Sequence, residues 1–157
     1  MQPQRMHYSC QVDIAATRDR VLALMTDPQR AHEWQPGLER YESVEGERGR
    51  PGSVSRLHFA GAPGDGVMTE RVETLDESSY DVVYLLGPVR NENHNTFTDL
   101  PADAATTGGG TRWLAEHVFH LPPMMLDHMG PGGQDAFRAN TQRAMETFRD
   151  WCEANAR

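Results

Sequence analysis

The feature that most constrains this fold is one amphipathic segment late in the chain. From Gln134 to about Ala154, apolar or small residues recur at intervals of four, three, four and three. This spacing places them along one face of an α-helix, and such a face has to be buried against another layer. The face consists of Phe137, Thr141, Ala144, Phe148 and Trp151. We therefore expect a long helix packed against the rest of the molecule.

Most of the sequence before this helix has the alternating pattern of half-buried strands. The first strand is expected at residues 7–14, where apolar residues from Tyr8 to Ile14 alternate with polar ones. Two short helices follow; Thr17 suits the N-cap of the first, and the second reaches about Trp34. Six more strands are expected at residues 38–44, 53–60, 66–75, 79–86, 91–100 and 111–120.

Composition limits the class of protein. The 157 residues fit one globular domain over residues 1–157, with 38% hydrophobic and 24% charged residues. A net charge of −8 argues against nucleic acid and anionic membranes as partners, and no run of about 20 apolar residues predicts membrane insertion. The two cysteines, Cys10 and Cys152, are too few for a disulfide framework, and residues 1–7 do not look like a signal peptide. We expect reduced thiols and a cytoplasmic location.

Several short motifs occur in an order that is similar to that of a known superfamily. They are Val12-Asp13-Ile14-Ala15-Ala16, Val21, Asp27-Pro28, Glu33-Trp34-Gln35-Pro36-Gly37, Gly52-Ser53-Val54, Thr69-Glu70-Arg71-Val72 and Gly110-Thr111-Arg112-Trp113. The chain thereby resembles the START-like helix-grip superfamily (SRPBCC), and within it the polyketide cyclase/dehydrase-like group. This resemblance implies an α+β helix-grip fold, in which a curved seven-stranded antiparallel sheet surrounds a long C-terminal helix and two short helices follow the first strand. It also implies an apolar small molecule between sheet and helix, but no single activity.

Strand alternation indicates which side chains face that space, if the face with fewer charges is concave. In residues 91–100 two assignments are open: either Phe97 points inward with Asn91, Asn93 and Asn95, or His94 does. Periodicity alone favours a filled core, whereas the resemblance favours a cavity. The residues expected to bind the ligand are Trp34, Leu57, Phe59, Met68, Tyr80, Tyr84, Trp113, Phe119, Met125, Phe137 and Thr141.

Two polar residues, Glu70 and His117, fall on the same inward face. A buried carboxylate costs several kcal/mol unless it is paired, protonated or wet. Glu70 therefore either bonds an inward Arg or Tyr or meets water near the rim, or it contacts ligand or acts as an acid or base. His117 is either a hydrogen-bonded core residue or the second member of an acid/base pair with Glu70.

Other chemistry has little support in the sequence. His117 and His120 point to opposite faces of their strand, and no HExxH or CxxC motif occurs, so no metal is expected. Nucleophile motifs and a phosphate-binding loop are also absent from the sequence, so we expect no cofactor.

Two surface features remain. The methionine-rich segment 124–129 is either a lid over the cavity or a packed loop. Outward-facing Val67, Val83, Leu85, Leu114 and Val118 suggest an apolar patch and a weak homodimer through the convex face of the sheet.

Three functions are compatible with these observations. The first is binding of an apolar, lipid-like or polycyclic small molecule. The second is a metal-free cyclase or dehydratase that uses Glu70 and His117. The third is an interaction protein without a ligand. We expect the first, because no catalytic set is assembled elsewhere in the chain.

Overall fold

The computed structural model describes residues 4–47, 49–61, 66–101 and 109–156. The strands are β1 (Gln4–Ile14), β2 (Leu38–Glu45), β3 (Val54–Phe59), β4 (Val67–Leu75), β5 (Ser79–Leu86), β6 (Val89–Leu100) and β7 (Gly110–Leu121). The helices are α1 (Arg18–Met25), α2 (Ala31–Trp34), α3 (Pro123–Met129) and α4 (Gly133–Asn155).

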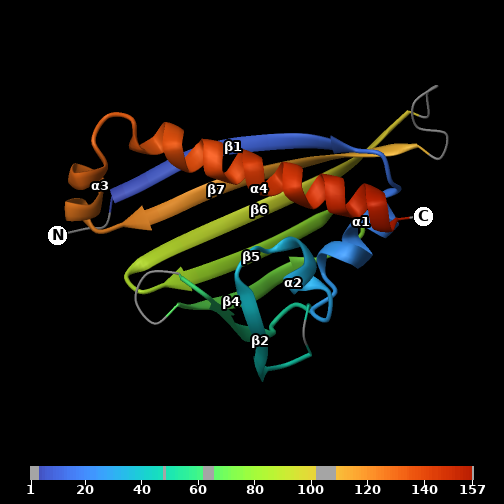
Figure 1. The fold of residues 1–157 in the computed structure, drawn as a ribbon, viewed down its shortest axis with the longest axis horizontal. Coiled ribbons are helices and arrows are strands. Elements are labelled where there is room, and N and C mark those ends of the chain that lie inside the picture. Colours follow the sequence, from blue (N-terminus) through green and yellow to red (C-terminus); the bar gives the residue numbers. More distant parts are fainter. Residues whose placement is uncertain (1–3, 48, 62–65, 102–108, 157) are drawn as a thin grey trace.

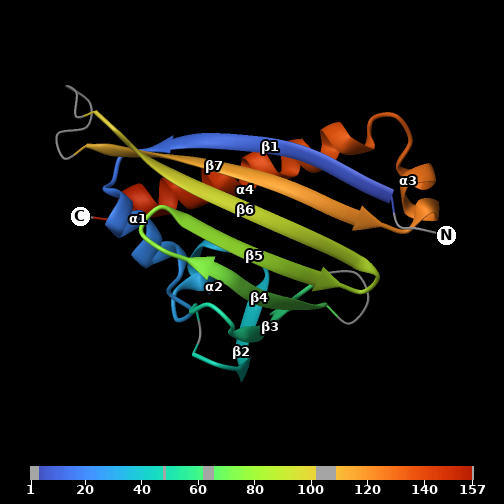
Figure 2. The same ribbon diagram turned by 180° about the vertical axis from the view of Figure 1, so that it is seen from behind.

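All seven strands form one antiparallel sheet in the order β1-β7-β6-β5-β4-β3-β2. The sheet is open, with β1 and β2 at its edges, and α4 lies along one face of it (Figure 1). Figure 2 shows the opposite face, which none of the described helices covers. The predicted helix-grip fold is confirmed. The first strand starts at Gln4 rather than His7 because its pairing with β7 continues as far as Leu121.

The concave face of the sheet carries the side chains that alternation assigns to it. Val72 and Val82 are 1% exposed, and Tyr80 is 6% exposed. In β6, Phe97 and Asn95 are both 2% exposed, whereas His94 is exposed on the other face. The ambiguity in this strand is therefore resolved in favour of the assignment with Phe97 and the asparagines inward.

The buried face of α4 differs from the predicted one by about one residue. Met145, Phe148 and Cys152 are at most 2% exposed, whereas Ala144 is exposed and Trp151 is half-buried. The reason is that α4 packs along β1 at one side of the sheet rather than over its centre (Figure 1). The helix face that carries residues 145, 148 and 152 packs on the sheet. Ala144 lies next to this face, beside the half of the sheet that α4 does not cover.

The methionine-rich segment forms a short helix, α3, rather than a loop. Its Met124 and Met125 are 72% and 43% exposed, while Leu126 and Met129 pack against the main core. In both ribbon views α3 lies at the opposite end of the sheet from α1 and α2 (Figures 1 and 2). None of the helices among the described residues has the length and apolar character needed to cross a membrane.

The apolar patch predicted for the convex face is interrupted by charged side chains. Val83 is 6% exposed, and in the sheet register it lies between Arg71 and Glu92. Glu92 in turn separates it from Val118 and pairs with Arg90 at 3.3 Å. Charged side chains thus interrupt the predicted patch. A weak homodimer through this face stays a prediction, which light scattering over a range of concentrations would check.

Candidate ligand-binding cavity

A cavity of about 320 Å³ lies between the middle of α4, the concave face of strands β2 to β7 and the segment that joins α1 to α2. It occupies the part of the concave face that α4 leaves uncovered. The described residues that line it are Met25, Thr26, Asp27, Pro28, Ala31, Trp34, Gln35, Pro36, Tyr41, Phe59, Met68, Glu70, Tyr80, Tyr84, Asn93, Asn95, Trp113, His117, Thr141, Ala144 and Met145.

Aromatic side chains make up much of this lining. The predicted residues found there are Trp34, Phe59, Met68, Tyr80, Tyr84, Trp113 and Thr141, together with Glu70 and His117. An apolar, aromatic wall with a few polar groups is the usual composition of a small-molecule site, and 320 Å³ lies near the lower end of the size range of such sites.

Four residues predicted to bind ligand lie outside this lining. Leu57 is fully buried in a second small core with Ala31 and Leu38. Phe119 and Phe137 pack edge to face at a centroid distance of 5.2 Å, and Met125 is exposed on α3. Near Phe137, α4 packs along β1, and the Phe137 and Phe119 side chains fill the space between the helix and the sheet. The space opens further along α4, beside α2.

Glu70 is the most buried charged group of the cavity, with an exposed fraction of 4%. The Tyr41 hydroxyl donates a hydrogen bond to its Oε1 atom, and the Tyr84 hydroxyl also bonds to the carboxyl group. Burial raises the pKa of Glu70, and the two tyrosine hydrogen bonds partly oppose that effect. No ion pair involving Glu70 occurs within the described ranges.

Tyr41 was not predicted from the sequence, and the structure explains why. A register shift between Leu38 and Arg40 interrupts the pairing of β2 with β3. Leu38 is buried and Tyr41 also faces the cavity, although three positions separate them. Strict alternation places residues three apart on opposite faces, so the pattern of β2 could not be interpreted without its bulge.

Two of the tyrosines near Glu70, Tyr80 and Tyr84, stay neutral over the physiological pH range. Burial, followed by the nearby Glu70 charge, raises the pKa of Tyr80 and of Tyr84 well above the usual value. Both phenols can therefore donate hydrogen bonds without losing their protons.

His117 lies on the other side of the cavity. Its ring stacks on Tyr8 and Phe119 at centroid distances of 5.3 and 5.9 Å, and Asn91 Nδ2 lies 3.3 Å from its Nδ1. Burial lowers the pKa of His117 to about 4, so the ring is neutral near pH 7. Three strand spacings, roughly 14 Å along the sheet, separate β7 from β4. The predicted acid/base pair of Glu70 and His117 is therefore not in direct contact.

The asparagines of β6 supply further polar groups. Asn95 Nδ2 donates to the Tyr80 carbonyl oxygen at 2.8 Å, and Asn95 Oδ1 accepts from Trp113 Nε1 at 2.8 Å. This bridge fixes the Trp113 ring in the cavity wall. Asn93 Oδ1 and Trp34 Nε1 are buried and have no hydrogen-bond partner among the described residues, so each can bind a polar group of a ligand.

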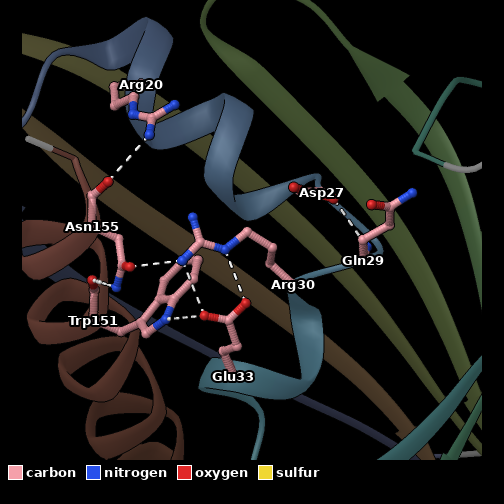
Figure 3. Close-up of polar contacts among 7 residues, drawn as sticks. All are labelled: Arg20, Asp27, Gln29, Arg30, Glu33, Trp151 and Asn155. Atoms are coloured by element: carbon pink, nitrogen blue, oxygen red, sulfur yellow. Dashed lines mark hydrogen bonds and ion pairs between the residues drawn. The ribbon is translucent and has the colours of Figure 1, made fainter.

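A polar network fixes the α2 side of the cavity against the end of α4 (Figure 3). The Arg30 guanidinium donates to both carboxylate oxygens of Glu33 at 2.9 and 3.0 Å and to Asn155 Oδ1 at 2.7 Å. It also lies 5.0 Å from the centroid of the Trp151 ring. Because Trp34 is on the same short helix as Glu33, this network positions one aromatic wall of the cavity.

Comparison with protein families found one match. The model described as "Polyketide cyclase / dehydrase and lipid transport" matches residues 5–151. A search of curated protein sequences found no match.

Solved structures with the same fold include Ara h 8.0201, with a TM-score of 0.72 and 12% sequence identity. That match covers 97% of this chain and 100% of the other. Norcoclaurine synthase from Thalictrum flavum matches with a TM-score of 0.69 and 14% identity, over 98% of this chain and 90% of the other. At these identities the likeness concerns the fold alone.

Proposed function

This chain belongs to the polyketide cyclase / dehydrase and lipid transport family, and we propose that it binds a lipid-like or polycyclic small molecule in the cavity between the sheet and α4. The observation that carries this proposal is the open, aromatic-lined space that α4 leaves beside β4 and β5. A volume of about 320 Å³, near the lower end of the usual range, favours a small ligand.

Binding without chemistry is favoured over catalysis. The two inward ionisable groups named above, Glu70 and His117, do not contact each other. The chain also contains no lysine, so no lysine side chain can form a Schiff base with a carbonyl substrate.

Native mass spectrometry of the purified protein tests the proposal. We expect a bound small molecule at a one-to-one ratio, released on denaturation, because an apolar cavity of this size retains a fitting ligand through purification. A protein that carries no small molecule, and that also fails to bind aromatic compounds added to it, would contradict the proposal.

One observation favours a second candidate, a metal-free cyclase or dehydratase. Glu70 is buried beside Tyr41 and Tyr84, and its raised pKa is typical of a general acid or base. If Glu70 is catalytic, Glu70→Gln cuts the turnover of a substrate by about 10²–10⁴-fold and leaves its binding nearly intact. If it holds the ligand, the same change weakens binding.

A further inference from the structure

The electrostatics of the cavity indicate which kind of ligand it accepts. We propose that the ligand carries a protonated amine, which binds the Glu70 carboxylate while the apolar part of the ligand lies among the aromatic side chains. This inference rests on the proposed function, and it adds the charge of the ligand and the residue that binds it.

The first observation is that Glu70 has partners but no counter-ion. Its hydrogen bonds come from the phenol hydroxyls of Tyr41 and Tyr84. A carboxylate offers about four acceptor sites, so two phenol donors leave room for more. Since Glu70 lines the cavity, a donor on the ligand can reach it. A buried carboxylate is more stable with a partner of opposite charge than without one.

The second observation is that the described residues of the cavity lining supply no positive charge. The chain has no lysine, and no arginine is among the described residues that line the cavity. On the same strand, Arg71 points to the opposite face and pairs with Glu73 at 2.8 Å. His117 is neutral, because burial lowers its pKa to about 4. The other carboxyl group of the lining, on Asp27, adds negative charge. The described part of the lining therefore holds no cation, and a cationic ligand would supply one.

The third observation is the ring of aromatic side chains around the carboxyl group. Tyr41, Tyr80 and Tyr84 lie close enough to Glu70 to interact with it electrostatically or by hydrogen bonds. Trp34 and Trp113 continue the wall. The face of an aromatic ring attracts an organic cation, and a desolvated site strengthens that attraction. A carboxylate enclosed by aromatic rings matches an ammonium group better than it matches a neutral or anionic group.

Three naphthalene compounds that differ mainly in charge test the proposal. They are 2-(2-naphthyl)ethylamine, which is a cation at pH 8, 2-(2-naphthyl)ethanol, which is neutral, and 2-naphthylacetate, which is an anion. Calorimetry with the intact protein at pH 8 gives the affinity for each. We expect the amine to bind roughly 10- to 100-fold more tightly than the alcohol, as for a charged hydrogen bond, and the acetate to bind most weakly.

Two variants identify the residue responsible. Glu70→Gln is nearly isosteric, and we expect it to remove the preference for the amine while binding of the alcohol changes little. Glu73→Gln makes the same substitution on the exposed face of the same strand, and we expect it to keep the full preference. Thermal unfolding of each variant shows whether it is folded. The comparison of the three compounds on the wild-type protein tests the charge preference even if a variant does not fold.

The outcomes separate this inference from the proposed function. If the alcohol binds as tightly as the amine, or if Glu70→Gln keeps the preference, the ligand's charge is not recognised by Glu70 and this inference is wrong. The proposed function then stands. If none of the three compounds binds, both are contradicted.

Discussion

Phe148→Ala is expected to lower the free energy of unfolding by about 3–5 kcal/mol, the usual cost of truncating a fully buried phenylalanine. Phe148 has no exposed surface. Its ring packs in T-shaped contacts with Trp34 and Trp113 at centroid distances of 4.8 and 5.5 Å. It thereby joins α4 to α2 and to β7, and its removal leaves a void between three elements. Urea denaturation followed by circular dichroism measures the loss.

Phe137→Ala on the same helix is the matched control. Phe137 is partly exposed, and its described ring contact is with Phe119. We therefore expect a clearly smaller loss of stability there than at Phe148. Equal losses at the two positions would show that α4 is packed to the same extent along its whole length, contrary to the structure described above.

Acidification is expected to destabilise the protein through His117. Burial holds the pKa of His117 at about 4, against 6.5 for an ordinary histidine. Between these values the unfolded chain binds a proton that the folded protein does not, so stability is fully present above pH 6.5 and is lost as the pH falls toward 4. This difference between the two pKa values corresponds to roughly 3 kcal/mol of unfolding free energy.

His117→Phe isolates this contribution. Phenylalanine can keep the stacking on Tyr8 and Phe119 but cannot be protonated. The difference in unfolding free energy between wild type and variant should therefore change by roughly 3 kcal/mol between pH 7 and pH 4. The raised pKa of Glu70 has the opposite effect, because it lowers the stability as the pH rises above the ordinary pKa of a glutamate. This effect is the same in both proteins, so it cancels in the difference between them. A difference that does not vary with pH would contradict the assignment.

The alternation of the strands predicted which residues share the concave face. In β4, the charged Arg71 and Glu73 pointed outward on this reasoning, and Glu70 and Val72 pointed inward. The structure has the same arrangement, with exposed fractions of 4% for Glu70 and 1% for Val72. A period of two is a local property of a strand, so the sequence is enough to determine it.

The placement of the cavity along α4 could not be predicted in the same way. The helical pattern identified an apolar face that includes Phe137, Ala144 and Phe148. Which part of this face meets the sheet depends on where α4 lies over it, and that is set by contacts with β1 and α2 that are distant in sequence. Phe137 was consequently assigned to the cavity although it packs on Phe119, and Tyr41 was missed because of the bulge in β2.

The central claim, that the space beside α4 binds a small molecule, is tested most directly by filling that space. Ala144 and Ala139 are both exposed on α4, but Ala144 lines the cavity, whereas Ala139 is not part of the cavity lining and lies on another face of the helix. The measurement is the fluorescence titration of wild type, Ala144→Trp and Ala139→Trp with the neutral compound N-phenyl-1-naphthylamine. We predict saturable one-site binding to wild type and Ala139→Trp, and loss of that binding in Ala144→Trp with the fold retained. Equal binding to all three proteins would show that the compound binds elsewhere and would contradict the claim.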